Sequence, residues 1–530
     1  MTRAPALLLI AGVLVMGAGP AQAQFDNVGS FEFPTSATGE AQYHFLRGAA
    51  LLHSFGWIQA REELHAAQEI DPDFAMAYWA ESLSYNHPLF SQMDPTEPRR
   101  ALERLAPTPV ERLAKAPTVR EQGFLSAVEI LWGEGDQVTR RVGYMDAMSR
   151  LYEQYPNDSE VAAFYALSVL SASVATGDLT QRMNVQAGTI ALKLFEQNRD
   201  HPGAAHYTIH AFDSPVLAPL SLEAAYAFAE IAPAVAHARH MPTHIFIQHG
   251  MWDRVSDNNE SAYTAARELW RPDEPMGAAV HPLDWGQYGD LQLGDYRKAR
   301  LWIDRIESLA FEGVFLEGGP RGAPGQARAT RTVSLMKARY VVETEEWEVR
   351  PITDESAADE LLATGLSAAR TGDQATVAQA EAALKEMAER GPNGNRSANI
   401  MAKEVGALLH AGMGHGSVAT RLMDEAQAIV ESGADPRGAA SPVKPVHELY
   451  GEILLDLDRP ADAIEKFETS LLRLPNRSRS LLGLARAYAR TGDRETAAEA
   501  YKQLTDVWSG RESFDGFQEA RRFLEATGQP

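Results

Sequence analysis

The stretch "KPVHELYGEILLDLDRPADAIEKFETSLLRLPN", residues 444–476, decides the fold of this chain. The small residues Gly451 and Ala463 stand at positions 8 and 20 of a 34-residue unit. The large Phe467 follows at position 24, and Pro475 closes the unit at position 32. Small residues let two antiparallel helices approach closely, and a proline cannot continue the helix that it ends. The spacing therefore predicts a helical hairpin.

The same frame recurs twice more in the chain. A second unit starts at Ser478, with its key residues at Ala485, Tyr488, Ala497 and Tyr501. A third unit starts at Ala41, with its key residues at Gly48, Leu51, Ala60, Leu64, Ala67 and Pro72. Three units in one register are typical of tetratricopeptide (TPR) repeats. We therefore predict an all-α, TPR-like superhelical solenoid in which antiparallel helix hairpins bury their apolar faces against one another.

The solenoid is predicted to have two parts. Residues 24–310 form an N-terminal TPR-like helical region with His-rich motifs, and residues 351–530 form a C-terminal TPR-like region that ends in a capping helix. Residues 311–350 between them contain "FEGVFLEGGPRGAPGQ", whose glycines and prolines indicate a loop, followed by a connecting helix.

The chain opens with "MTRAPALLLIAGVLVMGAGPAQAQ". Arg3 gives a basic start, an apolar run follows, and the Ala21–Ala23 triplet has the small-x-small pattern of a cleavage site. The apolar run is too short to span a bilayer. We predict a cleaved signal peptide over residues 1–23, a periplasmic or secreted protein, and no stable membrane anchor.

Composition excludes several function classes. The chain has no cysteine, so disulfides, thiolate metal sites and cysteine nucleophiles are excluded. Its formal net charge of −23, without long basic runs, argues against nucleic acid as a partner. Neither a nucleophile elbow (GxSxG), a phosphate-binding GxxxxGK, an HExxH nor a dinucleotide GxGxxG is present. No catalytic residue can be named from motifs.

Histidines are concentrated in one part of the chain. Seven of the fifteen lie between His201 and His249, although those two are themselves interpreted as peripheral. The motif "HPGAAHYTIHAFDSP" spaces two histidines four residues apart, so that they share a helix face and can hold one metal ion. In "PAVAHARHMPTHIF", Pro242 is predicted to start a new helix, so that the flanking His240 and His244 approach from two sides of a bend.

These spacings predict a metal site. Its ligands are expected among His206, His210, His237, His240 and His244. Further candidates for this or an additional site are His53, His87, Asp213, His281 and Asp284. Imidazole and carboxylate donors without thiolate favour zinc, copper or iron. The alternative is that these histidines only form structural hydrogen bonds.

The mature chain also resembles a family of exported bacterial TPR proteins. The resemblance rests on "LLHSFGWIQAREELHAAQEIDPDFAMAYWAESLSYNHPLF", "AAHYTIHAFDSP", "HARHMPTHIFIQHGMWD", "HPLDWGQYGDLQLG" and "KPVHELYGEILLDLDRPADAIEKFE". It implies the helical solenoid but no particular reaction. Its recurring His-containing blocks correspond here to His53, His87, His206, His210, His237, His240, His244 and His281. Family members tend to have Trp after "HPL", where this chain has Phe90.

Two functions follow from these observations. In the first, the solenoid binds a protein segment, a peptide or a small molecule in its concave groove, beside a His-rich metal site. In the alternative, the chain is a metal-dependent enzyme, a hydrolase or an oxidoreductase, because a few histidine ligands leave a coordination position for water or substrate. The sequence indicates neither the metal, the substrate nor the oligomeric state.

Overall fold

The computed structural model describes residues 23–25, 27–90, 93–271, 276–312, 314, 325–390, 394–508 and 515–528. The predicted signal peptide, except for Ala23, lies outside the described residues, as does most of the Gly/Pro-rich loop after Phe311.

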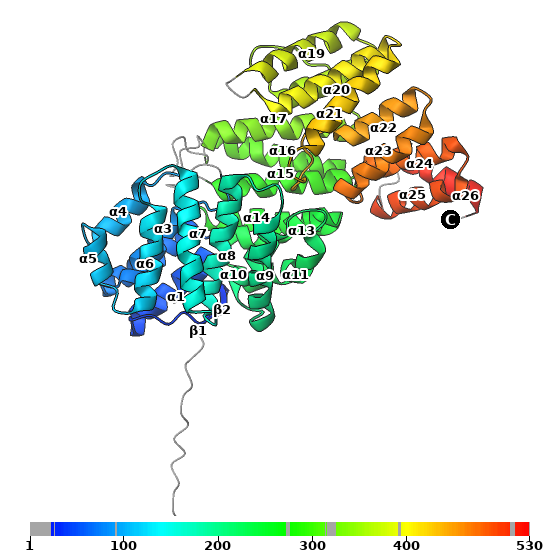
Figure 1. Ribbon diagram of the computed structural model, residues 1–530. Coiled ribbons are helices and arrows are strands. Elements are labelled where there is room, and N and C mark those ends of the chain that lie inside the picture. The colour runs from blue at the N-terminus through cyan, green and yellow to red at the C-terminus, as the bar shows by residue number, and fades with distance from the viewer. Residues whose placement is uncertain are drawn as a thin grey trace, which may run out of the picture.

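The N-terminal half is a series of antiparallel helices that follows a short β-hairpin (Figure 1). Strands β1 (Ala23–Phe25) and β2 (Gly29–Phe31) pair antiparallel. The helices are α1 (Gly39–His53), α2 (Trp57–Ile70), α3 (Ala75–Ser84), α4 (Thr96–Leu105), α5 (Pro109–Ala114), α6 (Val119–Leu131), α7 (Gln137–Gln154), α8 (Ser159–Thr176), α9 (Arg182–Gln197), α10 (Pro202–Ala211), the 3-10 helix η1 (Ala218–Ser221), α11 (Leu222–Ile231), α12 (Ala236–His240), α13 (Pro242–Gln248) and α14 (Trp252–Leu269).

The C-terminal half continues the helical stack and curves away from the first half in Figure 1. Its helices are α15 (Gly277–Gln292), α16 (Tyr296–Phe311), α17 (Gly325–Thr344), α18 (Ala358–Thr371), α19 (Gln374–Glu389), α20 (Arg396–Gly412), α21 (Gly416–Glu431), α22 (Val446–Asp456), α23 (Pro460–Arg473), α24 (Ser478–Thr491), α25 (Arg494–Val507) and α26 (Asp515–Thr527).

The predicted hairpins are present in their predicted registers, which confirms the fold class. The three units correspond to α1/α2, α22/α23 and α24/α25, and α26 is the capping helix. The small residues stand where the helices touch. A Cβ at Gly48 would lie 2.8 Å from Cγ of Leu64, and one at Gly451 would lie 2.7 Å from Cζ of Phe467. Both contacts are shorter than a Cβ normally makes, so the close approach of the helices requires glycine.

One segment of the C-terminal half reaches back to the N-terminal half. The loop between α21 and α22 contributes Ala440 to the larger hydrophobic core, which runs from Val28 to Tyr288 and also includes Leu474 after α23. Val443, three residues later, belongs to the core built from α17 to α24. The loop is therefore anchored in both cores, and it lies next to the histidine cluster described below.

A single helix in the described part of the chain, α8, combines the length and the apolar composition of a membrane span. Of its 18 residues, 78% are buried inside the protein. Burial in the core accounts for this composition, because a helix that packs on all sides is apolar on all sides.

Candidate metal centre

The first helix of the site is α10, whose N-terminus is fixed by two neighbouring residues. The ring of His201 caps the helix by accepting a hydrogen bond from the backbone N–H of Ala204, and Pro202 occupies the first helical position. This start sets the register that puts His206 and His210 on one face, with ring centroids 4.6 Å apart.

The second part of the site is the bend between α12 and α13. α12 ends at His240, and α13 begins at Pro242, as the sequence predicts. The rings of His240 and His244 meet across the bend, with centroids 5.2 Å apart and planes at 78°. The proline therefore sets the angle at which the two imidazoles converge.

Six imidazoles form two neighbouring triads. The ligand nitrogens of the first triad, His206, His210 and His237, all lie within 4.8 Å of one another. Those of the second triad, His240, His244 and His281, meet the same criterion. The two triads adjoin, because the ring of His210 lies 5.7 Å from that of His244. The sequence predicted one cluster of five; the structure has two clusters of three, and α15 supplies the sixth ring.

Hydrogen bonds fix the tautomers of two of these rings. The Nδ1–H of His206 donates to the backbone carbonyl of His53 at 2.6 Å. The Nδ1–H of His244 donates to Oδ2 of Asp213 at 2.8 Å, and Gln248 donates to the other carboxylate oxygen at 3.1 Å. Both rings therefore keep the Nε2 lone pair for another partner. An outer acceptor that orients a ring in this way is the usual support of a metal-bound histidine.

A third ring is fixed in the same way. The Nδ1–H of His240 donates to Oδ1 of Asn259 at 2.6 Å, and the amide group of Asn259 is oriented by its own bond to the carbonyl of Val255. The Nε2 atoms of His240 and His210 are buried and have no hydrogen-bond partner among the described residues. Buried polar atoms are nearly always satisfied, so these two nitrogens are available to bind a further partner.

Five of the six imidazoles of the cluster are held neutral. Burial, together with the charges of neighbouring groups, lowers the pKa of His206 and of His281 to about 3. Burial, with the same mutual repulsion, lowers the pKa of three more rings well below 6.5: His210, His237 and His240. Neutral imidazole is the form that coordinates a metal ion, so protons do not compete for these nitrogens at neutral pH.

The first triad is covered by a strained aromatic residue. The ring of Phe55 lies 4.4 Å from that of His206, 5.4 Å from His237 and 5.8 Å from His210. Its backbone has a φ of +59°, which is unfavourable for a bulky residue. Strain of this kind costs about 1–3 kcal/mol and is concentrated at functional sites.

The second triad is covered by a tryptophan. Trp285 lies with its ring centroid 5.1 Å from His240, 4.4 Å from His244 and 4.7 Å from His281. Gly438 of the α21–α22 loop packs against the indole: a Cβ there would fall 1.9 Å from it. The loop from the C-terminal half therefore forms part of the wall of the site.

A third buried cluster lies next to the first triad. The ring of His53 contacts Oε2 of Glu160 and the hydroxyl of Tyr207, each at 2.8 Å. His201 lies 2.9 Å from Oε1 of the same glutamate. Burial alone would raise the pKa of Glu160, but the two imidazoles lower it to about 2. The two histidines together offset the charge of this carboxylate. The cluster thereby holds His53 in place, and the backbone carbonyl of His53 orients the ring of His206.

The remaining predicted residues have other positions. His87 lies outside both triads, with its ring 5.5 Å from that of Trp57. Asp284 accepts a hydrogen bond from Nη1 of Arg339 at 2.7 Å, and it is not a member of either triad. His53 and Asp213 support rings of the cluster, and His281 belongs to the second triad.

Sequence reasoning missed several supporting residues. Phe55, Glu160 and Asn259 come from segments without any metal-binding motif, and His201 was interpreted as peripheral although it is buried. The one sequence feature that points to Phe55 is its position between a histidine and a tryptophan in "LLHSFGW".

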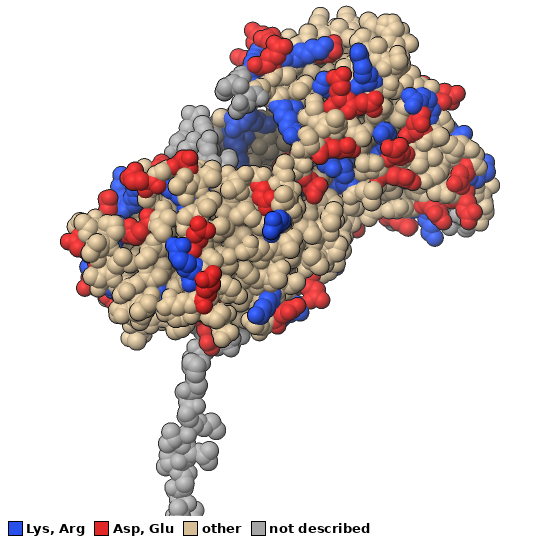
Figure 2. Space-filling model, viewed as in Figure 1, with Lys and Arg blue, Asp and Glu red and all other residues tan. Residues whose placement is uncertain are grey.

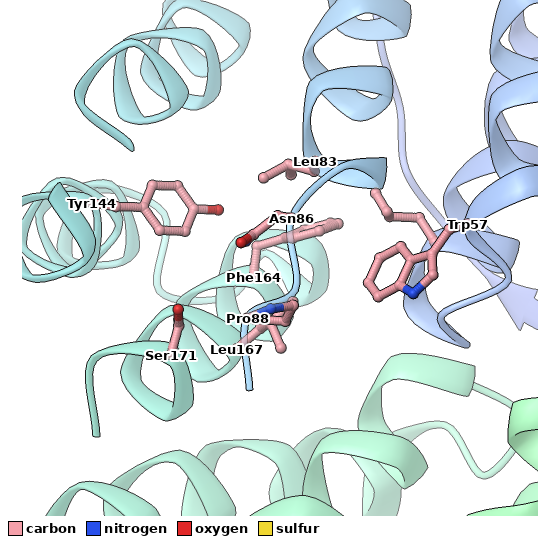
Figure 3. A pocket seen from close by; sticks show the side chains of 9 residues that line it. Trp57, Leu83, Asn86, Pro88, Tyr144, Phe164, Leu167 and Ser171 are labelled. Carbon is pink, nitrogen blue, oxygen red and sulfur yellow. The ribbon is translucent and has the colours of Figure 1, made fainter. Parts of the chain in front are cut away.

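A small cavity near Trp57 is separate from the histidine cluster. Figure 3 shows its lining, with the hydroxyl of Tyr144 turned toward Asn86. Its volume of about 10 Å³ suits a single water molecule, and it lies beside the unpaired oxygens of Asn86 and Ser171. It is too small to receive a substrate.

Comparisons with known proteins give only distant similarities. No protein-family model matches the chain, and no curated protein matches it. A TPR protein from Parabacteroides merdae is 12% identical, with a TM-score of 0.27, over 55% of this chain and 98% of that chain. Yeast Tom70 is 11% identical, with a TM-score of 0.29, over 92% and 90% of the two chains. Human IFIT1, solved with m7Gppp-AAAA, is 10% identical, with a TM-score of 0.32, over 90% and 92%.

TM-scores of this size carry no argument about family or function. The TPR-like character of the chain rests on its own 34-residue hairpins, and its chemistry rests on the two histidine triads.

Proposed function

We propose that this chain is a metalloprotein whose TPR-like solenoid holds two transition-metal ions, one in each histidine triad. The observation that carries the proposal is the pair of adjoining three-imidazole sets, with the nitrogens of each set within 4.8 Å of one another. The unpartnered Nε2 atoms of His210 and His240, one in each triad, support it. Three imidazoles are the donor set of a metal site that keeps one position open.

The donor set favours copper or zinc over iron. All six nearest donors are imidazole nitrogens, which bind zinc and copper well. The iron sites of many oxygenases combine two histidines with a carboxylate. Here the neighbouring carboxylate of Asp213 is hydrogen-bonded to His244 and Gln248, so it orients a ring.

The alternative function is that of a metal-dependent hydrolase or oxidoreductase. It is supported by the partial exposure of the histidine rings, which would let a substrate reach a bound metal ion. Four of the six rings are half-buried, and the side chain of His244 is 13% exposed. When bound, a metal ion in such a site would supply Lewis acidity or redox chemistry to a ligand in its open position. The protein's contribution is to orient the imidazoles by hydrogen bonds and to cover them with Phe55 and Trp285.

The solenoid also fits a binding role outside the metal sites. Stacked TPR hairpins build a concave surface that holds protein segments, peptides or small molecules. The net charge of −23 argues against nucleic acid as the ligand. The N-terminal leader pattern supports cleavage and export to the periplasm or the medium, without a stable membrane anchor. Mass spectrometry of the mature N-terminus, near Gln24, tests the export.

Metal content tests the metalloprotein proposal directly. Protein purified without a His tag should contain about two metal ions per chain when measured by inductively coupled plasma mass spectrometry. His210→Ala and His240→Ala should each remove one ion, because each variant damages one triad. His44→Ala is the matched control, since His44 pairs with Glu63 and belongs to neither triad.

The control and the far-UV circular dichroism of each variant separate loss of metal from loss of fold. A wild-type protein that remains metal-free after incubation with zinc and with copper would overturn the proposal. The same holds if both variants bind as much metal as the wild type.

A further inference from the structure

Each triad has one arginine beside it. Arg437 belongs to the loop between α21 and α22, and its two neighbours both contact the site. The carbonyl of Pro436 accepts a hydrogen bond from Gln248, which also binds Asp213, and Gly438 packs on Trp285. Arg437 itself is exposed, between these two contacts.

The second arginine is Arg328, on α17. This helix packs along α15, the helix of His281, and Gln287 of α15 donates a hydrogen bond to the carbonyl of Met336 at 2.8 Å. Arg328 is half-buried, and the adjacent Ala329 shares a hydrophobic core with Ala279 and Val280 of α15, which directly precede His281. Burial lowers the pKa of Arg328 itself, and the nearby carboxylate of Asp284 only partly opposes this. Asp284 is already bound by Arg339.

Neither guanidinium is neutralised by the protein. Within the described part of the chain, no hydrogen bond or ion pair holds the side chain of Arg328 or Arg437. In a chain of net charge −23, two unpaired arginines at one site are unexpected, because acidic partners are abundant. Figure 2 shows Lys and Arg side chains gathered at a hollow between the two halves of the molecule, in the region where Figure 1 shows α17.

With two metal ions bound, the positive charges of the site would outnumber the negative charges. Imidazole ligands carry no charge when they bind a metal ion, so two divalent ions would bring a charge of +4. Asp213 accepts hydrogen bonds from His244 and Gln248 and offsets one of these charges. The charge of Asp284 is already offset by Arg339. The two unpaired arginines add further positive charge. Positive charge gathered at a partly buried site of this kind favours an anionic ligand.

We infer that the site takes an oxyanion ligand, a phosphate or a carboxylate group, that lies between the metal positions and the guanidinium groups of Arg328 and Arg437. The inference rests on the proposed metal function and names the substrate class of that same site. The planar guanidinium forms paired hydrogen bonds with both groups, which makes arginine the suited residue for either.

Isothermal titration of the zinc-loaded protein tests the inference. The probes are inorganic phosphate and benzoate, each added to the wild type, to Arg328→Gln and to Arg437→Gln. We expect at least one probe to bind, each substitution to weaken its binding at least tenfold, and the zinc content to stay at two ions per chain. Arg297→Gln on α16, an exposed arginine away from the triads, is the matched control and should bind as the wild type does.

Each outcome bears on the inference. Tighter binding of phosphate identifies a phosphate or phosphate-ester ligand, and tighter binding of benzoate identifies a carboxylate. Full zinc content with no binding of either probe, or with unchanged binding by both arginine variants, overturns the inference and leaves the metal proposal intact. If the wild type holds no zinc, the same titrations are run on the metal-free protein. Arginine-dependent binding then sustains the oxyanion site alone, and its absence overturns it.

Discussion

The Nε2 atoms of His206 and His237 lie 3.2 Å apart, although 31 residues separate them in the chain. The Nδ1–H of His206 is committed to a backbone carbonyl, so its Nε2 carries a lone pair. In the metal-free protein a proton on His237 must bridge the two nitrogens. A metal ion would replace that one proton, and the fold would need little change to receive it.

The first prediction concerns acid stability. The pKa of His206 and of His281 is lowered to about 3, from an ordinary value of 6.5. Their rings therefore stay neutral in the folded state, while those of the unfolded chain take up protons below pH 6.5. The metal-free protein should lose about 1.4 kcal/mol of unfolding free energy per pH unit for each such histidine as the pH falls from 6.5 to 5.

Urea denaturation at pH 7.5 and at pH 5.5, in the presence of a chelator, measures this loss. His281→Gln should show a smaller loss than the wild type, because one titrating ring is gone. Equal losses in the two proteins would contradict a buried, neutral His281. Buried carboxyl groups with a raised pKa, such as Glu404, contribute equally in both proteins, so the difference between the two losses reports on His281.

The second prediction concerns the support of His244. The carboxylate of Asp213 orients the ring of His244 and increases the basicity of its Nε2. Asp213→Asn removes this negative charge. The affinity of the second triad should fall 10- to 100-fold, and that of the first triad should not change. Competition with a chromophoric chelator measures both. Asp257→Asn, an exposed residue on α14, is the control. An unchanged affinity for both ions would mean that Asp213 has only a packing role.

The fold was predictable because it depends on local spacing. Gly451 and Phe467, 16 residues apart, touch directly, so the 34-residue frame already contains the contact. The contact between Gly48 and Leu64 and the helix break at Pro242 were predictable for the same reason. Each is decided by neighbours within one hairpin.

The division of the site into two triads was not predictable. His281 enters the second triad from α15, and its ring meets that of His240 at 4.7 Å across a separation of 41 residues. Such a meeting depends on how successive hairpins rotate against one another, which the repeat frame does not encode. The contact of Gly438 with Trp285 spans a larger separation still, and no local pattern marks it.

The third prediction concerns that loop contact. Gly438→Ala should lower the unfolding free energy and displace the loop from Trp285, because φ is +76° and the added Cβ would fall 1.9 Å from the indole. Gly492→Ala separates the two causes, since Gly492 has a φ of +88° and nothing within 4 Å. The control should cost only the backbone strain, about 1–2 kcal/mol.

Thermal denaturation and metal analysis of the two alanine variants check this prediction. Gly438→Ala should have the lower melting temperature and a weakened second metal site, whereas Gly492→Ala should keep both ions. Identical behaviour of the two variants would show that the loop does not press on the site.

The last prediction concerns a carboxyl group far from the triads. Glu404 on α20 is fully buried, and neither of its oxygens has a hydrogen-bond partner among the described residues. Burial, together with the charge of Asp359, raises its pKa well above 4.5, although the charge of Lys444 opposes this, so the folded protein favours the protonated form. The unfolded chain ionises it above pH 4.5. Wild-type stability is therefore lost as the pH rises from 4.5 toward the folded pKa.

Glu404→Gln keeps the shape of the protonated acid and cannot ionise. The variant should unfold with a free energy at least about 1 kcal/mol higher than that of the wild type at pH 8, and with nearly the same free energy at pH 4.5. Glu499→Gln, an exposed residue on α25, should show no such pH-dependent gain. Urea denaturation at the two pH values gives the comparison. A loss of stability in Glu404→Gln at both pH values would mean that the folded protein holds Glu404 ionised beside Lys444.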